Sequence, residues 1–138
     1  MNRNIARFSI VGIVATSVIA AFSIGNAYAA TAVSACSTTG SSGGATFASW
    51  TSSHVDINGM NVYDTKADGH HVAIRLISSN GSTSHYWPWH HNYGGNGTSI
   101  IFDTSASDAY GSLKKLTVEV ATMEGDEELW GCTNWVAL

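Results

Sequence analysis

Short apolar stretches alternate with turn residues along most of this chain. From residue 46 onward, runs rich in Val, Ile, Thr and aromatic residues are interrupted by Gly, Asn and Asp roughly every 8 to 12 residues. No apolar period of helical length occurs in this region. The pattern predicts an all-β domain, a single antiparallel β-sandwich of about seven strands, over residues 46–51, 55–63, 71–78, 83–87, 99–103, 116–123 and 129–136.

Two of these strands alternate clearly enough to assign their faces, because successive side chains of a strand point to opposite sides of the sheet. One side of each strand is aliphatic and is expected to face the core. The expected inward residues are Val72, Ile74, Leu76, Leu116, Val118 and Val120, and the expected outward ones are His71, Ala73, Arg75, Ile77, Thr117, Glu119 and Ala121.

Turn residues predict how the strands connect. Asn80-Gly81 is the pair favoured in a type I′ hairpin turn, so strands 71–78 and 83–87 should be antiparallel neighbours. Residues 124–127 should return the chain into the last strand. Asp64 to Gly69 begins like a calcium-binding EF-hand loop, but Lys66 occupies its third position and Arg75 its twelfth, where oxygen ligands belong. We therefore interpret it as a turn in which Asp64 is a local acceptor.

Residues 1–29 have the organisation of a secretory signal peptide. Arg3 and Arg7 form a positive start, the run from Phe8 to Phe22 is apolar or small, and Ala27-Tyr28-Ala29 is a small-x-small cleavage pattern. The apolar run is shorter than the roughly 20 residues that span a membrane. The sequence therefore predicts cleavage before Ala30 or Thr31 and a secreted, extracellular protein.

The expected mature chain begins with a small polar stretch. Residues 30–45 have no hydrophobic period, and we expect a flexible lead-in followed by one β-sandwich domain over residues 46–138. The chain has two cysteines, Cys36 and Cys132. Outside the cytoplasm an even pair is expected to form a disulfide, which would tie the lead-in to the last strand.

Charge narrows the range of partners. Without residues 1–29, only Lys66, Arg75, Lys114 and Lys115 remain against ten carboxylates, a net charge of −6. Nucleic acids and anionic membrane surfaces are bound through clusters of Lys and Arg. We therefore expect neither a nucleic-acid partner nor, after signal cleavage, a membrane partner; the oligomeric state cannot be inferred.

Two motifs resemble those of small secreted β proteins of actinomycete bacteria. Residues 62–75 are similar to their V-x-D-T-x-x-D-G-x-x-V pattern, and Trp130 to Val136 (WGCTNWV) is similar to their C-terminal ending. Members of that group often carry a further cysteine just before the Asp-Gly turn, where this chain has Ala67. The resemblance implies export, an all-β fold and one disulfide rather than two, and it implies no activity.

The densest group of candidate binding residues lies between residues 85 and 97, where aromatic residues and histidines precede a glycine-rich end. Exposed rings in a loop on a rigid scaffold can stack on sugars while amides bond the hydroxyl groups. This predicts a glycan or cell-surface ligand bound by Tyr86, Trp87, Trp89, Asn92 and Tyr93. The alternative is that Trp87 and Trp89, two residues apart on one strand face, only cap the core.

Two other functions remain open at this point. His85, His90 and His91 are possible ligands for Zn²⁺ or Cu²⁺, although adjacent His90 and His91 point to opposite sides of an extended backbone. A protein-protein role, as an inhibitor or a toxin-like factor, leaves no mark in a sequence. No local signature places a catalytic nucleophile, so we expect a non-catalytic protein that needs no cofactor.

Overall fold

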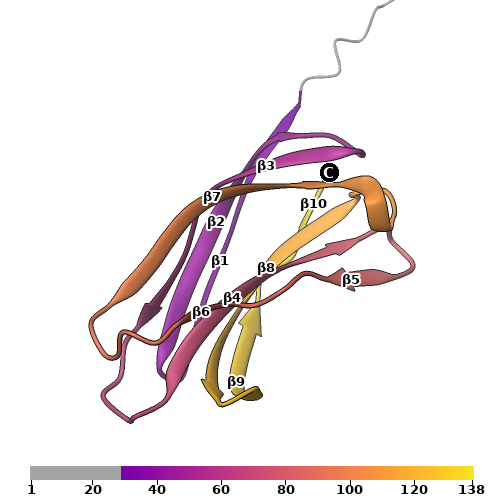
Figure 1. Ribbon diagram of the computed structural model, residues 1–138. Coiled ribbons are helices and arrows are strands. Elements are labelled where there is room, and N and C mark those ends of the chain that lie inside the picture. Colours follow the sequence, from indigo (N-terminus) through magenta and orange to yellow (C-terminus); the bar gives the residue numbers. More distant parts are fainter. Residues whose placement is uncertain (1–28) are drawn as a thin grey trace, which may run out of the picture.

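The computed structural model describes residues 29–138, so the predicted signal peptide lies outside the described residues apart from Ala29. The described chain forms two antiparallel sheets in a sandwich-like arrangement (Figure 1). The all-β prediction is thereby confirmed, with ten short strands instead of about seven. They are β1 (Ala30–Thr38), β2 (Ser41–Trp50), β3 (His54–Asp64), β4 (His71–Ser79), β5 (Ser84–Tyr86), β6 (His90–Asn92), β7 (Ser99–Ser107), β8 (Lys115–Glu124), β9 (Glu127–Thr133) and β10 (Val136–Ala137), with one 3₁₀ turn, η1 (Asp108–Tyr110).

The first sheet has the strand order β1-β2-β3-β7, and the second has the order β10-β8-β4-β5. In the second sheet, β6 also pairs with β4 and β9 also pairs with β8. Strands β4 and β8 therefore form its centre, paired from His71–Met123 to Ser79–Lys115. Within the described part of the chain, no helix is long and apolar enough to cross a membrane.

The expectation that residues 30–45 form a flexible lead-in is wrong. Residues 30–45 form β1 and the first half of β2, a hairpin whose turn holds Gly40 at a φ of +84°. Its small residues give no hydrophobic period, yet they are what the packing requires. A Cβ at Gly44 would lie 2.8 Å from the Cβ of Ala35, so only small side chains allow these two strands to pack this way.

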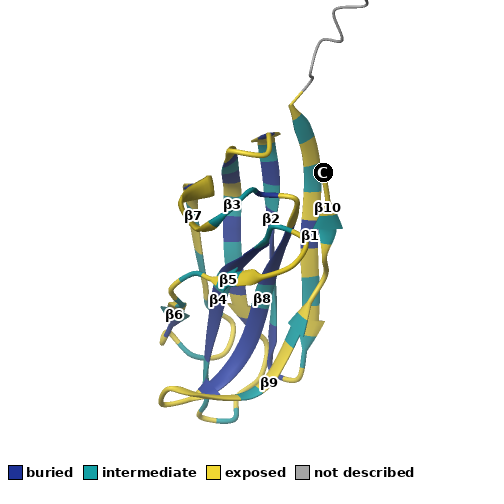
Figure 2. Ribbon diagram, turned by 90° about the vertical axis from the view of Figure 1, so that its right-hand side faces the viewer, coloured by how far each residue is buried: buried dark blue, intermediate teal, exposed yellow. Residues whose placement is uncertain are grey.

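The apolar core lies between the two sheets. The expected inward residues of β4 and β8 all belong to it, and Val118 and Val120 are completely buried. Figure 2 shows β4 and β8 buried over most of their length. Thr117 and Ala121, expected to face out, are also buried, because other parts of the chain cover the second face of this sheet.

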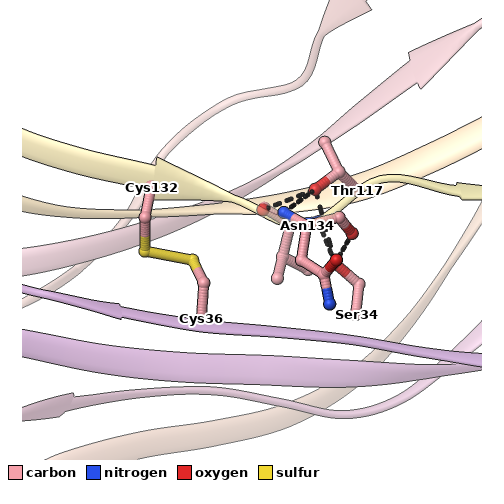
Figure 3. Close-up of a disulfide and its surroundings, with 6 residues drawn as sticks. Ser34, Cys36, Thr117, Cys132 and Asn134 are labelled. Atoms are coloured by element: carbon pink, nitrogen blue, oxygen red, sulfur yellow. Dashed lines mark hydrogen bonds between the residues drawn. A yellow bond between two sulfur atoms is a disulfide. The ribbon is translucent and has the colours of Figure 1, made fainter.

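A disulfide and a polar cluster join the two sheets (Figure 3). Cys36 of β1 is bonded to Cys132 of β9, as predicted. In the chain-entropy description, a bond across 96 residues stabilises the fold by about 4 to 5 kcal/mol. Beside it, the buried Ser34 hydroxyl donates to the Asn134 carbonyl at 2.7 Å and accepts from the Val118 amide at 3.1 Å. Ser34 thereby supplies a hydrogen-bond acceptor to the backbone of β8 between the stretch that pairs with β9 and the stretch that pairs with β10.

The hairpin between β4 and β5 is present, but its turn differs from the prediction. Ser79 pairs with Ser84, so the loop has four residues, and among them only Gly81 has a positive φ. A type I′ turn needs positive φ at both central residues. Instead, Oδ1 of Asn80 accepts from the amides of Ser82 and Thr83, each at 2.9 Å, and this side-chain bonding closes the wider loop.

The other two turns agree with the sequence. Glu124 pairs with Glu127 around Gly125 and Asp126, which returns the chain into β9. In the segment after β3, Oδ1 of Asp64 accepts from the Lys66 amide at 3.1 Å, so Asp64 is the local acceptor that was expected.

Candidate functional site

The predicted binding segment runs antiparallel along one edge of β4. Strand β5 pairs with the end of β4, and β6 pairs with its beginning. Residues 87–89 lie between these two short strands, and β6 forms where a loop was expected. Directly opposed residues of an antiparallel pair share a face of the sheet. Tyr86 opposes Ile77 and His91 opposes Ala73, so both project from the outer face of the second sheet.

The two tryptophans lie on opposite sides of the sheet. Trp87 packs against the main core and its Nε1 donates to Oγ of Ser78 at 3.1 Å. Trp89 packs on the outer face, against a small cluster of Ala73, Ala121 and Met123. The interpretation of both rings as caps on one strand face is therefore wrong. The irregular backbone around Pro88 breaks the strand alternation that would place them together.

An arginine is held at the centre of this outer face. The Arg75 guanidinium carbon lies 4.1 Å from the ring centroid of Trp89 and 4.7 Å from that of Tyr86. Its Nε donates to Oε2 of Glu119, directly opposite on β8. The Arg75 and Glu119 side chains are only 20% and 14% exposed. Cation–π contacts and a charge-assisted hydrogen bond strengthen as water is excluded, so the position of this guanidinium is fixed.

A second carboxylate borders the Arg75–Glu119 pair. Burial raises the pKa of Glu128 above its ordinary value, and the neighbouring Glu119 raises it further, while Arg75 acts in the opposite direction. The Glu128 carboxylate lies over Gly131, where a Cβ would overlap it. The centre of the face therefore holds one cation and two carboxylates.

A histidine pair and a tyrosine continue the face toward the start of β4. Nε2 of His71 lies 3.0 Å from Nδ1 of His91, and the Tyr93 ring stacks on His71 with centroids 4.4 Å apart. Burial lowers the pKa of His71, and the charge of His91 lowers it further. The hydrogen bond between the two rings needs one nitrogen without a proton, so it breaks when both become charged.

We call this surface the aromatic face and define it by Tyr86, Trp89, His91 and Tyr93 together with His71, Arg75 and Glu119. It includes three of the five predicted ligand-binding residues. Asn92 is only 4% exposed and its amide bonds Thr98 and the Gly94 amide. The hydrogen bonds of Asn92 thus stabilise the 92–98 loop, and Trp87 packs against the core, so neither side chain belongs to the aromatic face.

The three candidate metal-binding histidines are not brought together. The His85 ring stacks on Tyr110 at 3.6 Å, and the His90 ring lies 4.4 Å from that of Phe102. His91 bonds His71 on the outer face. Between residues 29 and 138, no group of three or more His, Cys, Asp or Glu side chains is arranged to hold a metal ion.

Sequence reasoning missed His71, Arg75 and Glu119 as members of the site. Strand alternation predicted that these three side chains face outward. It did not predict that Arg75 pairs with Glu119, or that residues 86–93 lie along the edge of β4. A hollow of about 700 Å³ lies elsewhere, on the first sheet. Small and uncharged residues line it and no aromatic ring does, so we place the candidate site on the aromatic face.

Comparisons with known proteins identify no relative. No protein-family model matches the chain, and neither a curated protein nor a solved structure matches it. The resemblance to small secreted actinomycete proteins therefore rests on its two motifs alone. Of what it implied, the structure supports an all-β protein of two antiparallel sheets with the Cys36–Cys132 disulfide.

Proposed function

We propose that this protein is a secreted, non-catalytic binding module whose aromatic face holds a neutral glycan. The observation that carries the proposal is the Arg75 guanidinium held between Tyr86 and Trp89 on a rigid sheet. Aromatic rings beside fixed polar donors are the combination that recognises sugar rings, which have both apolar faces and hydroxyl groups.

The polar part of the recognition comes from Arg75. Its guanidinium has five N–H donors, and within the described residues its one hydrogen bond uses Nε. The donors of the two terminal nitrogens are left for ligand hydroxyls. The guanidinium is already ordered by Glu119 and the two rings, so little side-chain entropy is lost when a ligand binds.

The length of the face suits an oligosaccharide rather than a single sugar. Arg75 and His71 are four residues apart on β4, a distance of about 13 Å along an extended strand. Tyr86 lies at one end and Tyr93 at the other, and they are 55% and 72% exposed. A chain of sugar rings lying along β4 would contact both ends.

The charge of the face favours a neutral ligand. Glu119 and Glu128 outnumber Arg75, so an acidic polysaccharide or a nucleic acid would meet a net negative surface. The disulfide indicates an oxidising environment, which agrees with the secretion that the first 29 residues predict.

Retention on insoluble neutral polysaccharides, chitin and cellulose, tests the proposal. We expect Trp89→Ala to weaken retention about tenfold, which corresponds to about 1.4 kcal/mol of binding free energy, and Tyr86→Ala to act in the same direction. Tyr110→Ala is the matched control, because Tyr110 is similarly exposed (61%) but lies off the face. Circular dichroism establishes that each variant is folded.

Wild-type protein that is not retained on any neutral polysaccharide would remove the proposal. So would equal retention of wild type, Trp89→Ala and Tyr86→Ala. Trp87→Ala is not informative for binding, because Trp87 packs against the core and its loss is expected to lower stability.

A further inference from the structure

Three buried side-chain oxygens have no hydrogen-bond partner in the described part of the chain: Oγ of Ser41, Oδ2 of Asp64 and Oδ2 of Asp68. Ser41 and Asp64 are each 1% exposed. Buried polar atoms in native proteins are almost always paired, and an unpaired one indicates a missing water or ion. For a carboxylate the requirement is stronger, because a buried charge without a partner is very costly.

The three oxygens border one short segment, Gly40–Ser41, at the end of the first hairpin. Ser41 of β2 directly opposes Asp64 of β3, so their side chains share a face, which is the buried one. Asp68 approaches from the following loop, where its Oδ2 would lie 3.5 Å from a Cβ added at Gly40. The Thr65 amide also donates to the Gly40 carbonyl at 3.0 Å, which fixes this loop against the hairpin.

Backbone amides already orient both carboxylates. Oδ1 of Asp64 accepts from the Lys66 amide and Oδ1 of Asp68 accepts from the His70 amide, each at 3.1 Å. Asp64 therefore keeps its Oδ2 for another partner, and Oδ2 of Asp68 has only the Lys66 ammonium as a charged neighbour.

The negative charge here is only partly balanced. Lys66 Nζ lies 3.5 Å from Oδ2 of Asp68, but no Lys, Arg or His nitrogen within residues 29–138 lies at ion-pair distance from Asp64. Asp64 also lines a hollow of about 280 Å³ that Asn96 and Glu124 border. Of the three residues with unpaired oxygens, Asp64 is the one that lines this hollow.

We propose that Ser41, Asp64 and Asp68 bind a hard divalent cation, Ca²⁺ in the first place. Two carboxylate oxygens and a hydroxyl are the ligands that Ca²⁺ prefers, and the two negative charges match its charge. Nitrogen and sulfur ligands, which Zn²⁺ and Cu²⁺ prefer, are absent from this set. The hollow beside Asp64 is also lined by His71 and Tyr93 of the aromatic face, but none of the three proposed ligands belongs to that face, and the proposal does not rest on the glycan function.

The site is not an EF-hand loop. Two of its ligands come from the segment that the sequence compares with such a loop, but the third, Ser41, comes from β2. Arg75, at the twelfth position of the supposed loop, bonds Glu119 on the aromatic face. Three protein oxygens leave the remaining coordination positions to water, so we expect weak binding, with a Kd of about 0.1 to 1 mM, as in extracellular calcium modules.

Titration of the purified chain with CaCl₂ and, in parallel, MgCl₂ tests the proposal by calorimetry and thermal unfolding. In the wild type we expect one site and a Tm that rises with CaCl₂ and falls back with EDTA. Asp64→Asn keeps the shape but removes the unpaired charge. It should raise Tm in EDTA and abolish the response to CaCl₂, a combination that a purely structural aspartate does not give.

Asp56→Asn is the matched control. It removes the same charge from β3 at a side chain that is 46% exposed, and it should leave the CaCl₂ response unchanged. A second readout is Tb³⁺ luminescence excited through Trp130, whose ring lies 5.9 Å from Lys66 Nζ. CaCl₂ should displace the Tb³⁺ and quench this emission.

No heat and no Tm change at about 10 mM CaCl₂ would overturn the proposal and assign the three oxygens to a buried water. The same conclusion follows if Asp64→Asn keeps the wild-type response. If Asp64→Asn does not fold, Asp68→Asn decides, because the Asp68 side chain is 16% exposed and lies in a loop. It should weaken Ca²⁺ binding at least tenfold, and unchanged binding would contradict the proposal. No glycan is present in these measurements, so their outcome is separate from that of the retention assay.

Discussion

The two sheets of the sandwich present different outer faces to solvent. That of the four-stranded sheet contains a hollow of about 700 Å³, lined by small residues such as Ala35 and Gly44. That of the six-stranded sheet holds Arg75 between two rings and against Glu119.

The comparison separates the volume of a hollow from the chemistry of the side chains around it. The hollow on the first sheet is lined by small side chains, which also let β1 and β2 pack closely, as the contact between Gly44 and Ala35 demonstrates. It is lined by no charged side chain and no aromatic ring that would orient a ligand. The aromatic face combines apolar rings, a fixed cation and carboxylates, the groups on which the proposed glycan binding depends.

The largest effect that separates the two faces is expected at Arg75. Arg75→Ala leaves the Glu119 carboxylate, 14% exposed, without its partner. We expect the free energy of unfolding to fall by about 2 to 3 kcal/mol, somewhat less than for a fully buried pair. Ile101→Ala on the other outer face, where Ile101 is 70% exposed, should change it by less than about 0.5 kcal/mol. Urea unfolding of both variants measures the difference, and equal stabilities would refute a structural ion pair.

A smaller effect is expected from adding one methyl group to each face. In Gly44→Ala the new Cβ would meet the Ser34 carbonyl at 2.9 Å as well as Ala35. Because backbone must move, we expect a loss of roughly 1 to 2 kcal/mol. In Gly131→Ala the obstacle is the flexible Glu128 carboxylate, which can turn away, so the loss should stay below about 0.5 kcal/mol. The comparison of the two faces fails if Gly131→Ala is the more destabilising change in thermal or urea unfolding.

The smallest effect is the contribution of His71, on the aromatic face, to the pH dependence of stability; His90, whose pKa is also lowered by burial, adds to it from outside that face. The folded-state pKa of His71 lies below its ordinary value of about 6.5 because burial and His91 disfavour its charged form. Its contribution to stability is therefore complete above about pH 6.5 and is lost as the pH falls below that value. We expect His71→Gln to flatten the decrease of Tm between about pH 7 and pH 5. His54→Gln, at an exposed histidine of β3, should not; identical slopes for wild type and His71→Gln would contradict the assignment.

Alternation predicted the inner faces of β4 and β8 correctly, since Val72, Ile74 and the apolar residues of β8 need only a period of two to be recognised. It failed for β1, because Ser34 and Ala35 carry no hydrophobic signal. Ser34 is held by Val118 and Asn134, which are far away in the sequence. Thr117 lies on the outer face as alternation predicts, but it is buried there, because Asn134, which donates to its hydroxyl, follows 17 residues later.

The candidate site was predicted in part. The aromatic segment was recognised from composition, and Tyr86, Trp89 and Tyr93 do lie on one face. Trp87 and Asn92 are directed elsewhere, because the backbone around Pro88 does not continue a strand and the 92–98 loop uses the Asn92 amide. Strand alternation alone could not reveal either exception.

The sequence by itself determined the β content, the aliphatic stripes of the central strands and the pairing of the only two cysteines, since each depends on local periodicity or on a simple count. The tertiary structure decided which side chains meet: Arg75 with Glu119 and Trp89, His71 with His91, and Ser41 with Asp64. The residues in these contacts are 14 to 44 positions apart in the sequence. Register between strands is set by the packing of the whole sandwich, and a one-residue shift would move every one of these side chains to the opposite face.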